Sequence, residues 1–337
     1  MKNRQSNIEL LRLVAIFMVL IVHADFLALD VPTKEIVNAN PFASFLRFFF
    51  QALSIVCVDV FVLISGWFGI RPSSKGFFYL LFQCVFFNCS IYIVMLLLGL
   101  TTLSANGIAD CLLLTNTYWF VKAYMLLYIL APVINSFIEN SSTNHIRNVL
   151  LLFFVFQTIF GFISDGAVFF ENGYSTISFV GLYLLARYTR MTVDKLKITP
   201  PPRTFFILIY GVISFIIAII AMASTYFTGF QFQRLFTYTN PLVILASLSL
   251  LLYFSRLQFT SNSINWLAAS AFAIYLFHTN TNLFLPYFVH NIKNIYNSFD
   301  GVYCLFSLLL FLFLVSLLAI IIDKIRIVVW KLIINNK

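Results

Sequence analysis

The sequence predicts an all-α protein that crosses a membrane many times. Of its 337 residues 61% are hydrophobic and only 10% are charged, and the mean hydropathy is +0.95. A water-soluble globule of this size needs more polar surface than such a composition can supply. A helix needs about 20 mostly apolar residues to cross the hydrocarbon core of a bilayer. The apolar residues fall into roughly ten runs of about this length, so we predict about ten transmembrane helices in one domain, residues 1–337.

Short polar breaks separate the runs, and no break is long enough for a separate soluble domain. The predicted helices are 8–29, 42–66, 76–100, 118–138, 147–164, 174–190, 204–227, 236–256, 264–288 and 302–330. The most polar break, "RYTRMTVDKLKITPPPR", carries three prolines that end any helix before the seventh run. The pattern is that of a single membrane domain.

The basic residues predict an orientation. If the N-terminus is cytoplasmic, 16 of the 21 Lys and Arg residues lie at the inner side and five at the outer side. The five are Lys34, Arg47, Lys122, Arg234 and Lys293. Because inner loops of membrane proteins are enriched in Lys and Arg, both termini are predicted to be cytoplasmic. The net charge of +9 then serves orientation and contact with anionic lipid headgroups, and not nucleic-acid binding.

Two polar residues interrupt the first apolar run. Arg12 and His23 are eleven residues apart in "NIELLRLVAIFMVLIVHADF", and eleven steps of about 100° place them on one helix face, separated by about 16 Å along the axis. A charged residue inside a span costs at least about 2.5 kcal/mol, so it normally faces protein or a water-filled cavity. The alternatives are that Arg12 reaches the inner interface with help from Glu9, and that His23 is a structural hydrogen-bonding residue.

Two further titratable residues lie inside predicted spans. His278 in "ASAFAIYLFHTN" has nearly the same predicted depth as His23, so the two could line one cavity. Asp59 in "VDVFVLISGWFG" is a functional candidate because buried carboxylates in membranes are costly, and a histidine is its natural partner. For His278 the alternative is an interhelical polar contact, which contributes about 0.6 kcal/mol.

Several chemistries are excluded by missing motifs. The chain has no GxxxxGK phosphate loop, no HExxH and no thiolate pair, so no metal site is predicted. Ser65 and Gly66 lack the spacing of a nucleophile elbow and are predicted to permit a helix end or close packing. Trp119 fits an aromatic belt at the outer interface. Of the chemistries considered, the one that remains is a reaction that uses a histidine inside the membrane.

An ordered set of motifs resembles a known family. The opening Arg-x10-His, "VDVFVLISGW", "YWFVKAYMLLYILAPVIN", "NPLVILASLSLLLYF", "AIYLFH" and the closing "DKIR" resemble acyltransferase family 3, the bacterial integral-membrane O-acyltransferases. The resemblance covers nearly the whole chain in the order of the family. It implies about ten transmembrane helices in the bacterial inner membrane. It also implies transfer of an acetyl or other short acyl group from cytoplasmic acyl-CoA to a hydroxyl of a surface polysaccharide or its lipid-linked precursor.

The resemblance also implies roles for individual residues. The catalytic set that it implies is His23, Asp59 and His278, and the donor- and substrate-binding set is Arg12, Ser65, Trp119 and Tyr275. No bound cofactor is implied, because acetyl-CoA is a donor substrate. Some members carry a fused periplasmic SGNH domain that this chain lacks, which leaves open whether a separate protein outside the membrane completes the transfer.

The resulting hypothesis is that the phosphates of acyl-CoA bind near Arg12, with Lys195, Lys197 and Arg203 as further candidates. The thioester extends toward His23, which deprotonates the acceptor hydroxyl. A transient acyl-histidine is the chemical alternative. Two other classes stay open: a transporter or flippase in which His23, Asp59 and His278 form a proton relay, and a catalytically silent membrane sensor.

Overall fold

The protein is described by a computed structural model over residues 4–164, 169–193 and 201–335, and every regular element in these ranges is helical. The helices are α1 (Ser6–Val22), α2 (Lys34–Ala39), α3 (Pro41–Ser54), α4 (Cys57–Phe68), α5 (Ser74–Leu97), α6 (Ala105–Cys111), α7 (Trp119–Asn140), α8 (Thr143–Gln157), α9 (Thr176–Val193), α10 (Arg203–Thr228), α11 (Pro241–Ser255), α12 (Asn262–Ala268), α13 (Ala271–His278), α14 (His290–Ser298) and α15 (Gly301–Asn335). The predicted all-α polytopic fold is confirmed.

Local sequence signals explain where many helices begin. α3 and α11 each start with a proline that follows an asparagine, and the side chains of Asn40 and Asn240 accept backbone N–H groups of the first turn. Ser73 does the same for α5. Such caps satisfy N–H groups that the helix itself leaves free, and proline is favoured at the first helical position. Pro201 and Pro202 are not helical, and Pro202 directly precedes the first residue of α10, Arg203.

Eight helical stretches of the described chain are long and apolar enough to cross a membrane. These stretches are Ser6–Leu27, Pro41–Phe68, Ser74–Leu97, Trp119–Asn140, Thr143–Ile163, Arg203–Thr228, Gln233–Ser255 and Gly301–Ile333. They match eight of the ten predicted runs. The sixth run forms α9, a helix of 18 residues with two arginines near its end, which falls outside this set.

The ninth run differs from its prediction because it is not a continuous helix. α13 ends at His278, and a π-helical turn follows only from Phe284 to Val289. The side chain of Asn280 accepts the backbone N–H of Asn282 at 3.0 Å, a local turn that competes with the helix. Pro286 then lacks the N–H that a regular helix needs. His278 is therefore the last residue of a helix inside the bundle.

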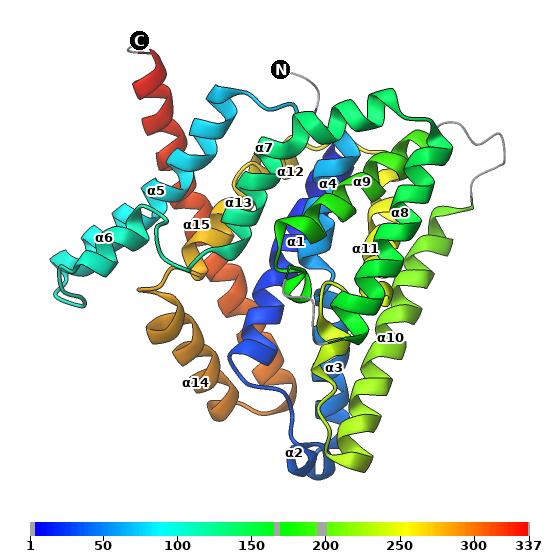
Figure 1. Cartoon of the computed structure of the whole chain (residues 1–337). Coiled ribbons are helices and arrows are strands. Elements are labelled where there is room, and N and C mark those ends of the chain that lie inside the picture. Colours follow the sequence, from blue (N-terminus) through cyan, green and yellow to red (C-terminus); the bar gives the residue numbers. More distant parts are fainter. Residues whose placement is uncertain (1–3, 165–168, 194–200, 336–337) are drawn as a thin grey trace.

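The helices form a bundle around α4 (Figure 1), which packs against α1, α9 and α11. In the segment that contains α3 and α4 72% of the most apolar window is buried, against 22% in α15, so α15 exposes far more of its apolar surface. Gly66 permits the close packing of α4 on α9, because a Cβ at this position would lie 2.5 Å from the carbonyl oxygen of Tyr183. Figure 1 shows both chain ends at one end of the bundle.

Candidate active site

The two predicted histidines meet at the centre of the bundle. His23 begins a π-helical turn, His23–Leu27, that continues α1, and His278 ends α13. The Nδ1 of His23 lies 2.9 Å from the Nε2 of His278, although the residues are 255 positions apart. The structure therefore brings together the two residues that helical rise placed at the same depth.

Hydrogen bonding sets the tautomer of both rings when they are uncharged. The Nδ1 of His278 lies 2.6 Å from the carbonyl oxygen of Ile274, and because a carbonyl can only accept, this nitrogen carries the hydrogen. The Nε2 of His278 then accepts a hydrogen bond from the Nδ1–H of His23. This leaves the Nε2 of His23 with a free lone pair, as a general base requires.

A cavity of about 1180 Å³ contains His23 in its wall. Eleven Phe, Tyr and Trp side chains line it, namely Phe26, Phe61, Tyr118, Trp119, Phe120, Tyr174, Phe236, Tyr238, Phe272, Tyr275 and Phe284. Its polar wall includes Asp30, Thr33, Thr117, Asn172, Gln231, Gln233, Arg234, Thr279 and Thr281. Thr279 and Thr281 belong to the ninth predicted span, and the loops that supply the other polar residues are predicted to lie at the outer side of the membrane. His278 lies behind His23 and does not line the cavity.

The cavity also follows the face of α1 that carries Arg12. Ile16, Val19 and His23 line it, and together with Arg12 they have the spacing of one helix face. The lining on α1 stops at Ile16, one turn before Arg12. Trp119 and Tyr275, both predicted to bind substrate, line the cavity, whereas Arg12 does not.

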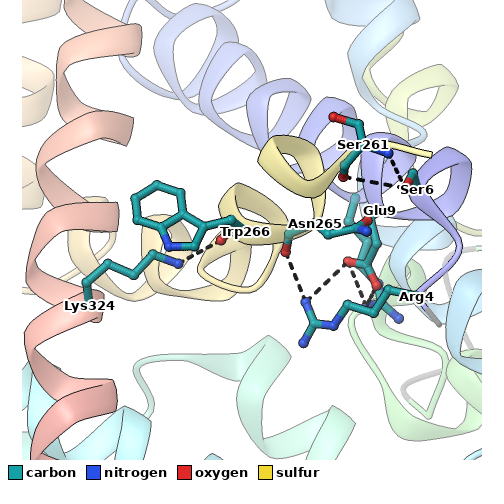
Figure 2. A network of polar contacts seen from close by, with 8 residues as sticks. Arg4, Ser6, Glu9, Ser261, Asn265, Trp266 and Lys324 are labelled. Atoms are coloured by element: carbon teal, nitrogen blue, oxygen red, sulfur yellow. Dashed lines mark hydrogen bonds and ion pairs between the residues drawn. The ribbon is translucent and has the colours of Figure 1, made fainter. Parts of the chain in front are cut away.

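Arg12 is paired with Glu9 at the N-terminal end of α1. Figure 2 shows the polar cluster to which Glu9 belongs, with Arg4, Asn265 and Lys324. The Nη1 of Arg12 lies 3.0 Å from the Oε1 of Glu9, and Nη1 of Arg4 lies 3.9 Å from the other oxygen of Glu9. The guanidinium of Arg4 and the ammonium of Lys324 donate to consecutive carbonyl oxygens of α12, those of Asn265 and Trp266. Two arginines thus pair with one carboxylate, and α12 lies between this group and Lys324 of α15.

Three further residues were predicted as candidates for the donor site. Lys195 and Lys197 lie outside the described residues. Arg203 begins α10 and is exposed.

Asp59 and Ser65 lie away from the histidines. Asp59 is fully buried, and the hydroxyl of Ser247 donates to its Oδ2 at 3.4 Å, while its Oδ1 has no hydrogen-bond partner among the described residues. The expected contact between Asp59 and a histidine is not formed, because α4 turns this side chain toward α11 instead of toward α13. Ser65 donates to the carbonyl oxygen of Phe61, or to the hydroxyl of Tyr124, from the α4–α7 side. The described residues therefore do not join His23, Asp59 and His278 into one proton relay.

Two polar groups of the cavity region were missed by the sequence predictions. Asp25, two residues after His23, forms an ion pair of 2.6 Å with Arg47. Asn280, 2% exposed, donates to the hydroxyl of Tyr118 at 3.2 Å and to Asn88 at 3.3 Å. An amide within an apolar run, two residues after a predicted site residue, was the signal that could have revealed Asn280.

A buried pair explains part of the closing motif. Asp323 and Arg326, both in "DKIR", form a fully buried ion pair of 2.8 Å, and Gln83 of α5 donates to the same carboxylate at 3.0 Å. This pair ties α15 to α5. In the described part of the chain, no three His, Cys, Asp or Glu side chains are placed to share a metal ion.

Comparison with known proteins gives one match. The family model described as "Acyltransferase domain" matches residues 5–322, which include both histidines and Arg12 and end one residue before Asp323. No curated protein and no solved structure matches the chain.

Proposed function

Because the chain belongs to acyltransferase family 3 and is a membrane acyltransferase, we propose that it transfers a short acyl group, such as acetyl, from acyl-CoA to a hydroxyl of a glycan or lipid-linked glycan. The observation that carries this proposal is the free lone pair of the His23 Nε2 in the wall of an aromatic cavity. A hydroxyl is a poor nucleophile until a base removes its proton, and general-base catalysis contributes about 10²–10⁴-fold to such a step.

The acceptor enters through the mouth formed by the predicted outer loops. Aromatic faces and a rim of hydroxyls, amides and Asp30 suit a ligand with apolar ring faces and many hydroxyl groups, as a sugar has. Trp119 and Tyr174 form part of this wall, with ring centroids 4.4 Å apart. These features support a glycan acceptor.

The donor reaches His23 from the other end of α1. The phosphates of acyl-CoA bind Arg12, whose planar guanidinium suits bidentate contact with phosphate. The acyl arm then lies along the face of Ile16 and Val19, where the cavity already extends. For the thioester to enter, the cavity has to open by one further helical turn, from Ile16 to Arg12.

In the transfer step, the Nε2 of His23 first accepts a proton and then returns it. The Nε2 of His23 takes the proton of the acceptor hydroxyl while its oxygen bonds to the thioester carbon. The carbon–sulfur bond breaks, the CoA thiolate leaves, and the proton on Nε2 passes to it. His278 holds the Nδ1–H of His23 and so keeps Nε2 unprotonated at the start of each cycle. We propose that the protein lies in the bacterial inner membrane, with the donor in the cytoplasm.

The test is acyl transfer by the purified chain in proteoliposomes, with acetyl-CoA and oligosaccharides from a bacterial surface polysaccharide. CoA thiol release and ester formation are measured for the wild type, His23→Ala and a matched control, His145→Ala, which removes an exposed histidine of α8. We expect His23→Ala to lose at least about 100-fold in rate, with the control unchanged. Wild-type transfer by His23→Ala at equal protein level would refute the proposal, and gradient-driven flux without ester formation would favour a transporter.

A further inference from the structure

Asp110, in the last turn of α6, holds two separate segments of the chain. The hydroxyls of Thr115 and Thr117 donate to its Oδ1, the second at 3.4 Å. The hydroxyl of Thr281, 171 residues away, donates to its Oδ2 at 3.1 Å. One carboxylate thus joins the loop before α7 to the break that follows α13.

Both segments form walls of the cavity around His23. The loop contributes Thr117, Tyr118 and Trp119, and the break contributes Thr279 and Thr281. The two threonines that line the cavity next to Asp110 are therefore the ones that its two oxygens fix.

The loop before α7 needs such support. Tyr118 has a φ of 55°, in the left-handed region, and so does Leu113 with a φ of 62°. Each such residue costs on the order of 1–3 kcal/mol and persists only where the surroundings hold it. Tyr118 is 5% exposed and is held by Asn280 of the opposite segment.

Asn88 of α5 forms a second connection between α6 and the segment that follows α13. The amide of Asn88 donates to the backbone carbonyl of Asp110 at 3.1 Å, and its oxygen accepts from Asn280 at 3.3 Å. Asn88 and Asn280 are each 2% exposed. Asn280 lies two residues after His278, so a shift of this segment would also displace the partner of His23.

Asp110 does not stabilise α6 itself. A carboxylate in the last turn of a helix is opposed by the helix dipole, which favours cations there. The three hydroxyl contacts lie outside α6, on the two walls.

We propose that Asp110 is a positioning residue that clamps the loop 112–118 to the segment 279–283, and thereby sets where the acceptor hydroxyl meets His23. The inference rests on the proposed function for its kinetic consequence, but the clamp itself is independent of it. Loss of the carboxylate frees both walls together, because each wall uses a different oxygen of the same group.

The first test follows hydrogen exchange of the full-length protein in nanodiscs. Asp110→Ala is expected to raise backbone exchange at least about 10-fold in both segments, 112–118 and 279–283, which corresponds to about 1.4 kcal/mol. The matched control, Asp300→Ala, removes an exposed acidic residue of another predicted outer loop and should change neither. Unchanged exchange in either segment would overturn the clamp. If Asp110→Ala does not fold, Thr281→Val carries the test, with faster exchange expected in 279–283.

The second test is kinetic. Asp110→Ala should raise the KM for the acceptor at least about 5-fold and leave the KM for acetyl-CoA unchanged, because only the outer walls move. Thr281→Val should add nothing in the Asp110→Ala background, as expected for two groups of one contact. Full additivity of the two changes would overturn the proposal. A wild-type protein without transferase activity would refute the proposed function, and the exchange result would still decide the clamp.

Discussion

The two ends of α1 satisfy their polar residues in opposite ways. At one end His23 is paired with a buried, uncharged partner by a single hydrogen bond of 2.9 Å, beside an aromatic cavity. At the other end Arg12 is paired with Glu9, which Arg4 also approaches, and the Arg12 side chain stays 34% exposed. An uncharged pair inside the protein suits proton transfer, whereas an exposed cation with a removable counter-charge suits an anionic ligand. The same helix face therefore offers two different chemistries about 16 Å apart.

The largest change after loss of His23 itself is expected from His278→Ala. Without the acceptor at its Nδ1, His23 can turn or carry its hydrogen on Nε2, so kcat should fall about 100-fold with the KM values little changed. His278→Gln offers a carbonyl oxygen to the same Nδ1–H and should recover part of the rate. Steady-state kinetics in proteoliposomes measures both. Equal losses in Ala and Gln variants would contradict a role through hydrogen bonding.

A substitution of Arg12, at the N-terminal end of α1, should change the KM for the donor alone. Arg12→Ala removes charge-assisted hydrogen bonds worth about 1.5–3 kcal/mol, so the KM for acetyl-CoA should rise about 10- to 100-fold while the KM for the acceptor stays the same. The KM of Arg12→Lys for acetyl-CoA should lie between those of the wild type and Arg12→Ala, because an ammonium cannot bind phosphate bidentately. Arg71→Ala removes an exposed arginine of a predicted inner loop and is the control. A changed KM for the acceptor would mean that the two ends are not separate.

The smallest effect is expected from Glu9→Gln. Glu9 occupies the guanidinium of Arg12 in this structure, so an anionic donor must compete with it. The uncharged amide should lower the KM for acetyl-CoA a few-fold, with a weaker effect at high salt, where charges are screened. Donor titrations at two ionic strengths measure it. A raised KM would show instead that Glu9 holds Arg12 in its binding position.

Periodicity and depth were enough to predict eight of the ten membrane spans and the proximity of His23 to His278, since both follow from local geometry. The expectation that both histidines line one cavity is correct for His23 and wrong for His278. The contact of Asp59 with Ser247 could not be predicted, because it depends on how α4 rotates against α11. The break after α13 lies within an apolar run, and only Asn280 and Pro286 marked it. Asp110 escaped notice because its partners are hydroxyls from a loop and from a segment far along the chain. Roles for Arg12, Ser65, Trp119 and Tyr275 came from family resemblance and stay predictions.

The 255 residues between the paired histidines also have a consequence for biogenesis. α1 is among the first segments made, and α13 follows about 10–50 s later at typical rates of synthesis. During that interval the ring of His23 has no partner, and the chamber around it lacks the wall that α13 and the following turn supply. A partly synthesised chain in the membrane therefore lacks both the partner of His23 and part of the cavity wall, and the site is complete only near the end of translation.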